Sequence, residues 1–131
     1  MTKEPHTYLD YNATTPVLPQ AIAAANEVMA HVGNPSSVHA SGRKARAVLE
    51  GARESVAKLV GVAPSKVVFT SGGTEANALA ILGSAAAGLA KRVIISAIEH
   101  DSVLESAKLA AQRYGLALDI VPVLPNGVID L

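Results

Sequence analysis

The first part of the chain repeats apolar residues with the period of an α-helix. Residues 1–15 form an irregular N-terminal arm without such a pattern. Pro16 and Pro19 then stand where a helix can begin, and apolar side chains recur at helical spacing as far as Val32. The pattern therefore predicts an amphipathic helix directly after the arm.

A polar loop and a second amphipathic helix follow. The loop covers residues 33–37, and Ser41 or Gly42 is expected to open the helix. One face of this helix is apolar and the other carries mixed charges, which is most simply a solvated face. Gly61 is a natural stop, because glycine readily adopts the left-handed conformation at a helix C-terminus.

From residue 66 the pattern alternates between short apolar runs and helical periods. Ser102 with Glu105 forms a possible capping box at the start of the last helix. Such alternation predicts parallel strands joined by right-handed crossovers, and hence an α/β fold. The predicted strands cover about 66–70, 92–97 and 117–121, and the predicted helices about 74–88 and 102–114.

The link between the first strand and its helix carries candidate chemistry. Gly72 and Gly73 allow a sharp turn and a close approach of backbone to a ligand, and the Thr74 hydroxyl can cap the free N–H groups of the helix. A helix start with open N–H groups suits a phosphate. An ordinary strand-to-helix turn with a threonine cap explains these residues equally well. They match neither a P-loop nor the Gly-x-Gly-x-x-Gly dinucleotide motif.

Composition and charge narrow the class of protein. The chain has 131 residues, half of them hydrophobic, with a formal net charge of zero. Nothing in this balance favours nucleic acid or an anionic membrane as a partner. It has no cysteine, so disulfides, thiolate metal sites and a cysteine nucleophile are excluded, and no metal site is predicted. The polar N-terminus and the lack of a membrane-length apolar run predict a soluble, cytoplasmic protein.

The second strand is followed by a histidine at what should be the same edge of the sheet. His100 alone is more simply a cap or a satisfied polar residue. Beside a phosphate-binding turn, it becomes a candidate to stack on a ring or to move a proton near neutral pH. Among the other histidines, His6 and His31 read as surface residues, and the role of His39 stays open.

Several motifs in register resemble the N-terminal third of a cysteine desulfurase of the class V aminotransferase family, in the group that serves nitrogenase and general iron–sulfur cluster assembly. The likeness covers almost the whole chain. The motifs that carry it are Tyr8–Pro16, Gly33–His39, Phe69–Asn77, Ser96–His100 and Asn126–Leu131.

The resemblance implies an enzyme dependent on pyridoxal 5′-phosphate, with the large domain of the aspartate-aminotransferase fold. Such an enzyme converts L-cysteine to L-alanine, transfers the sulfur to its own cysteine, is usually a homodimer, and serves an iron–sulfur scaffold or another sulfur-acceptor protein. By resemblance, Gly73 and Thr74 would bind the cofactor phosphate, and His100 would stack on the pyridine ring and assist proton transfer. Asn34 would belong to a substrate loop near the active site. Residues 16–131 would then be an incomplete large domain.

The resemblance also implies parts that this chain lacks. The family's cofactor-binding lysine and sulfur-accepting cysteine both lie beyond residue 131, and no lysine here stands where it could replace the first. The chain is therefore expected to be a fragment that is inactive alone. Two alternatives stay open: another enzyme of the same family, such as selenocysteine lyase, or a non-catalytic module that binds a partner or completes a split enzyme.

The family's sheet order makes a further prediction about the fold. By resemblance, the large domain has a mostly parallel, seven-stranded sheet in the order first-seventh-sixth-fourth-fifth-second-third. The strands at 92–97 and 117–121 should therefore pair directly. The strand at 66–70 should be separated from both of them and lack its neighbours.

Overall fold

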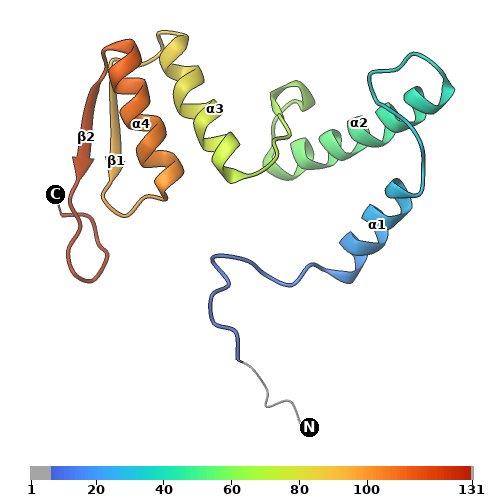
Figure 1. Cartoon of the computed structure of the whole chain (residues 1–131), viewed down its shortest axis with the longest axis horizontal. Helices are drawn as coiled ribbons and strands as arrows, with labels where there is room; N and C mark the ends of the chain where they lie inside the picture. Colours follow the sequence, from blue (N-terminus) through green and yellow to red (C-terminus); the bar gives the residue numbers. More distant parts are fainter. Residues whose placement is uncertain (1–6, 131) are drawn as a thin grey trace. The chain divides into compact units, whose positions relative to one another are not determined.

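The computed structural model describes residues 7–130, and its internal contacts divide the chain into two units (Figure 1). The first unit is Met1–Val68 and the second is Phe69–Leu131. The division into an arm (1–15) and an incomplete large domain (16–131) rests on the sequence pattern and the family resemblance, not on internal contacts. It stays a prediction.

The first unit is helical. It contains α1 (Pro19–Met29), α2 (Ala40–Val60) and the short 3₁₀ helix η1 (Pro64–Lys66). Proline occupies the first turn of α1, where its missing N–H costs no helical hydrogen bond. Gly61 ends α2 in the left-handed conformation, with φ of 72°, as predicted. The Arg53 side chain donates to the Val67 carbonyl at 2.6 Å and thereby ties α2 to the segment after η1.

The second unit has the predicted alternation of helix and strand. It contains α3 (Gly73–Ala86), β1 (Arg92–Ser96), α4 (Asp101–Tyr114) and β2 (Ala117–Val121). The strands pair in parallel, from Arg92 opposite Ala117 to Ser96 opposite Val121. In Figure 1, α4 lies along this pair, and α3 lies beside α4. The direct pairing predicted for the two strands is confirmed.

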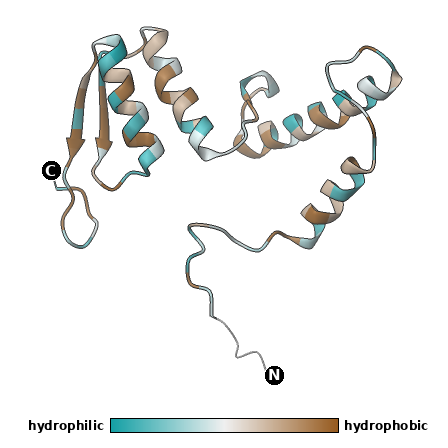
Figure 2. Cartoon of the chain, in the orientation of Figure 1, coloured by the Kyte–Doolittle hydropathy of each residue, from teal (hydrophilic) through white to brown (hydrophobic). Residues whose placement is uncertain are grey.

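Small side chains make up most of the buried core. Ala107 and Ala110 of α4 are fully buried, and Ala85 of α3 is 4% exposed. Alanine lets helices approach closely, so the alanine-rich sequence supports the contact between α3 and α4. Large apolar residues are often exposed instead; Ile94 in β1, for example, is 63% exposed. Figure 2 shows that hydrophobic residues make up much of both strands.

The strand predicted at residues 66–70 is wrong. Lys66 closes η1, and residues 67–70 belong to neither strand of the sheet found in residues 7–130. Val67 is extended, with φ of −93° and ψ of 127°, as its β-branched side chain favours. A strand also needs a neighbour for its N–H and C=O groups, and the local sequence cannot supply one.

Candidate functional site

The turn before α3 ends at a helix start that no side chain caps. Gly72 is the N-cap residue and α3 begins at Gly73, so Thr74 lies inside the first turn and its hydroxyl does not form the predicted cap. The first N–H groups of a helix have no partner within it. Around Gly72 and Gly73, a Cβ would meet nothing within 4 Å. Open N–H groups, the positive end of the helix dipole and free space together fit a phosphate.

The Glu75 carboxylate is hydrogen-bonded to Ser71, the residue just before the two glycines. One oxygen of Glu75 accepts hydrogen bonds from the Ser71 hydroxyl at 2.6 Å and from the Ser71 backbone N–H at 2.7 Å. These two hydrogen bonds lower the pKa of Glu75 because both favour its charged form. The bond from the hydroxyl has the larger effect and the bond from the backbone N–H the smaller. Since Glu75 already occupies the Ser71 N–H, a phosphate would use the N–H groups of Gly73 and Thr74.

His100 caps α4 through its ring. Its Nδ1 accepts the Ser102 backbone N–H at 3.1 Å and lies 2.8 Å from the Ser102 hydroxyl oxygen. An Nδ1 that accepts a hydrogen bond carries no proton, so in this arrangement the ring proton is on Nε2. The capping box predicted for Ser102 and Glu105 is wrong, because Ser102 is already inside the helix and Glu105 pairs with Lys108 at 2.8 Å.

A side-chain hydrogen bond joins the starts of α3 and α4. The Asn77 amide donates to the Ser102 hydroxyl at 2.9 Å, and that hydroxyl also contacts the His100 ring. Both helices rise from the same end of the second unit in Figure 1. The turn at Gly73 and Thr74 and the imidazole of His100 therefore lie at the same end of this unit, and all three residues are exposed.

Asn34 belongs to the first unit, in the loop between α1 and α2. Its side-chain oxygen accepts the Ser36 N–H at 2.9 Å, and its carbonyl accepts the Ser37 N–H, also at 2.9 Å. Such a turn is what asparagine favours in loops. The Asn34 side chain thus shapes its own loop.

His39 and Gly42 hold this loop against α2, and the sequence did not identify either role. His39 caps α2, with its Nδ1 3.3 Å from the Gly42 nitrogen. Gly42 is buried, and a Cβ there would lie 2.2 Å from the Ser37 carbonyl oxygen. A histidine caps a helix less often than Ser or Asp, so the role of His39 was not visible locally. His31 is exposed as predicted, and His6 lies outside the described residues.

Two kinds of site are not found among residues 7–130. No group of three or more His, Cys, Asp or Glu side chains in this range is placed to hold a metal ion. Within the same range, every helix is too short or too polar to span a bilayer.

Comparison with known proteins adds what the geometry alone does not give. Residues 7–131 match the family described as aminotransferase class-V. Cysteine desulfurase IscS 1 of Archaeoglobus fulgidus is 43% identical over 127 residues, covering 95% of this chain and 33% of that protein. Human selenocysteine lyase is 37% identical over 140 residues, covering 92% of this chain and 32% of that protein.

A solved structure shows the same fold. The NifS-like protein from Rickettsia africae ESF-5 matches with a TM-score of 0.73 and 33% identity, over 94% of this chain and 33% of that one. The predicted α/β fold class is confirmed by this likeness and by the parallel strands. The chain spans about a third of the length of each of these relatives.

Proposed function

The chain belongs to the aminotransferase class-V family, and from this premise we propose that it forms the N-terminal part of the cofactor-binding domain of a cysteine desulfurase. The observation that carries the proposal is the 43% identity to an archaeal cysteine desulfurase over 95% of the chain. The complete enzyme would convert L-cysteine to L-alanine and transfer the sulfur to an enzyme cysteine for iron–sulfur cluster assembly.

The start of α3 would hold the phosphate of pyridoxal 5′-phosphate. Bound to the enzyme, this cofactor supplies an electron sink for carbanion chemistry, while the protein binds and orients it. The N–H groups of Gly73 and Thr74 and the Thr74 hydroxyl would donate to phosphate oxygens. Free space beside both glycines supports this role, since a side chain there would occupy the volume the anion needs.

His100 would be the catalytic residue contributed by this chain. Because Nδ1 accepts the Ser102 N–H, Nε2 is the ring nitrogen that carries the proton. Such a ring can stack on a planar cofactor with one face and move a proton at Nε2. The Asn77–Ser102 bond would keep this ring in register with the phosphate turn.

The remaining parts of the proposal concern the complete enzyme. Asn34 would lie in a loop near the substrate, residues 1–15 would form an N-terminal arm, and residues 16–131 would be part of the large domain. We expect a cytoplasmic homodimer that passes sulfur to a scaffold or another acceptor protein and uses neither nucleic acid nor a membrane. The chain has no cysteine to accept sulfur, so we expect it to be inactive alone.

A chimera tests the proposal directly. This chain would replace the matching N-terminal third of the Archaeoglobus fulgidus cysteine desulfurase, and cofactor loading and alanine release from L-cysteine would be measured. We expect both to be retained, and Thr74→Ala to weaken cofactor binding by about 1.5–3 kcal/mol, as for a lost hydrogen bond to a charged group. A folded chimera that binds no cofactor would refute the proposal.

Selenocysteine lyase is the second candidate, favoured by the 37% identity to the human enzyme. The same chimera distinguishes the two if L-selenocysteine and L-cysteine are compared as substrates. A second chimera on the human selenocysteine lyase separates the contribution of this chain from that of the host protein. If this chain raised selenocysteine turnover relative to cysteine in both hosts, the second candidate would replace the first.

A further inference from the structure

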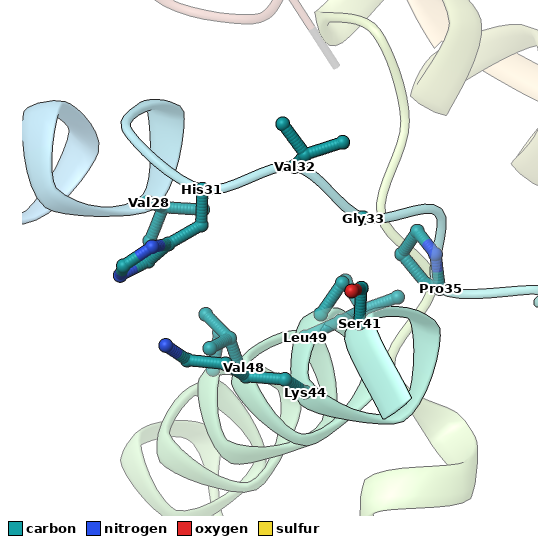
Figure 3. A pocket seen from close by; sticks show the side chains of 11 residues that line it. Val28, His31, Val32, Gly33, Pro35, Ser41, Lys44, Val48 and Leu49 are labelled. Carbon is teal, nitrogen blue, oxygen red and sulfur yellow. The ribbon is translucent and has the colours of Figure 1, made fainter. Parts of the chain in front are cut away.

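The two units differ in how firmly they hold their polar side chains. In the first unit, Figure 3 shows the His31 ring and the Lys44 amine beside an apolar groove. This groove is open to solvent, since Val32 in its wall is 94% exposed. In the second unit, by contrast, hydrogen bonds connect the polar side chains at the starts of α3 and α4. This second group therefore has a defined direction, which its donors and acceptors determine.

Asn77 is the amide side chain of a helix that is otherwise made mostly of small and apolar residues. It lies in α3, one turn after Gly73. Asparagine is less favourable than alanine inside a helix, because its side chain competes for backbone hydrogen bonds. The Asn77 side chain is half-buried and donates to the Ser102 hydroxyl of α4 at 2.9 Å. A contact between two helices therefore accounts for a residue that helix propensity disfavours.

The bond from Asn77 decides which way the Ser102 hydroxyl points. A hydroxyl has one proton to donate and two lone pairs that accept. The Asn77 amide donates to the Ser102 oxygen, so it occupies one lone pair and leaves the hydroxyl proton for another partner. The His100 Nδ1 is such a partner, because it lies 2.8 Å from that oxygen and carries no proton, since it already accepts the Ser102 N–H at 3.1 Å. The hydrogen bonds thus run in one direction, from Asn77 through Ser102 to His100.

We propose that Asn77 is a positioning residue, which acts through the Ser102 hydroxyl to keep the proton of the His100 ring on Nε2. The inference rests on the catalytic role proposed for His100. Ser102 directs two donors at Nδ1, so a proton on that nitrogen is disfavoured because it would face both of them. Hydrogen bonds in series also polarise one another. The helix that would bind the phosphate at Gly73 and Thr74 therefore also sets the state of the ring.

Asn77→Asp tests the direction of these hydrogen bonds. Aspartate has nearly the shape of asparagine, but its carboxylate only accepts, so the Ser102 hydroxyl proton should turn toward residue 77 and away from His100. The Ser102 oxygen then faces Nδ1 as an acceptor and favours a proton there. In the 131-residue chain, the ratio of Nδ1–H to Nε2–H rings should rise about two- to twelve-fold, the range expected for one hydrogen bond. The ratio is measured by NMR of the His100 ring nitrogens at about pH 8.5, where histidine side chains are ordinarily neutral.

Control variants separate this route from other effects of the new charge. Asn26→Asp makes the same chemical change at an exposed position of α1 and should leave the ratio unchanged. Ser102→Ala removes the hydroxyl but keeps the backbone N–H that bonds to Nδ1, and in this background Asn77→Asp should have no further effect. Ser102→Thr keeps a hydroxyl and should keep the response. The inference is overturned if Asn77→Asp leaves the ratio unchanged, or if it acts equally with and without the Ser102 hydroxyl, since the charge then acts through space.

The chimera separates this inference from the proposed function. A folded chimera that binds no cofactor refutes the proposed function, whereas the ratio of the two ring forms in the isolated chain still decides the role of Asn77. In an active chimera, Asn77→Asp should lower alanine release and keep cofactor loading, because the N–H groups of Gly73 and Thr74 are unchanged. Loss of cofactor loading together with activity would overturn the inference, since Asn77 would then support the phosphate turn instead of the ring.

Discussion

A pair of glycine-to-alanine substitutions in α2 tests how the Asn34 loop is held. Gly42 and Gly51 lie on the same helix, and the chemical change is the same at both positions. A Cβ at Gly42 would lie 2.2 Å from the Ser37 carbonyl oxygen and 2.7 Å from the Ser37 Cβ. A Cβ at Gly51 would meet nothing within 4 Å. Only the first substitution requires the backbone of the loop to move.

The expected magnitudes follow from this difference. Overpacking costs about 1–3 kcal/mol, and contact with backbone atoms places Gly42→Ala near the upper end. Alanine regains about 0.5–1 kcal/mol in a helix, so the net loss of folding stability at Gly42 should be about 2 kcal/mol. Gly51→Ala should instead gain about 0.5–1 kcal/mol, because only the helix propensity changes. The two variants should therefore differ by about 3 kcal/mol.

Urea unfolding and amide hydrogen exchange measure the two effects. A chain with two units need not unfold in a single transition. Hydrogen exchange is therefore measured at individual α2 amides. The Ser36 amide, which bonds to Asn34, should lose protection in Gly42→Ala and keep it in Gly51→Ala. Equal α2 protection in the two variants, or an unchanged Ser36 amide in Gly42→Ala, would refute the packing argument.

Three further predictions concern the second unit and the activity of the chain. Because hydrogen bonds from Ser71 lower the pKa of Glu75, their stabilising contribution should be complete above the ordinary glutamate pKa of about 4.3 and be lost as the pH falls through the lowered value; an NMR titration of the Glu75 carboxyl at an ordinary pKa would contradict this. In the chimera, His100→Asn should keep α4 capped but lose activity. His100→Ala should lose the cap as well as the activity and reduce stability by about 1 kcal/mol, measured by urea unfolding and alanine release. Full activity of the asparagine variant would exclude a catalytic role. The purified chain alone should release no alanine or sulfide from L-cysteine, since it has no cysteine to accept sulfur; turnover that survives removal of host desulfurases would contradict the expected inactivity.

Local signals in the sequence were sufficient to predict most of the helices and strands. The helix predicted at 102–114 is observed as Asp101–Tyr114, and the strand predicted at 117–121 is Ala117–Val121. Helical spacing and a terminal glycine act within one or two turns, so a short window of sequence contains the information. The family motifs identified the fold class for the same reason, because they combine local turn chemistry with a fixed order along the chain.

Contacts between residues far apart in the sequence decided the features that local signals did not predict. Val67 has the β-branched side chain of a strand, yet no neighbouring strand pairs with its segment in the described part of the chain. Ser102 looked like a cap by its local sequence, but it lies inside α4 and bonds instead to Asn77, 25 residues earlier. That bond brings the α3 turn and His100 to the same end of the second unit. Sequence alone determined which residues could bind a phosphate or move a proton. The packing of α3 against α4 decided that the α3 turn and His100 lie together, because pairing and packing depend on groups far apart along the chain.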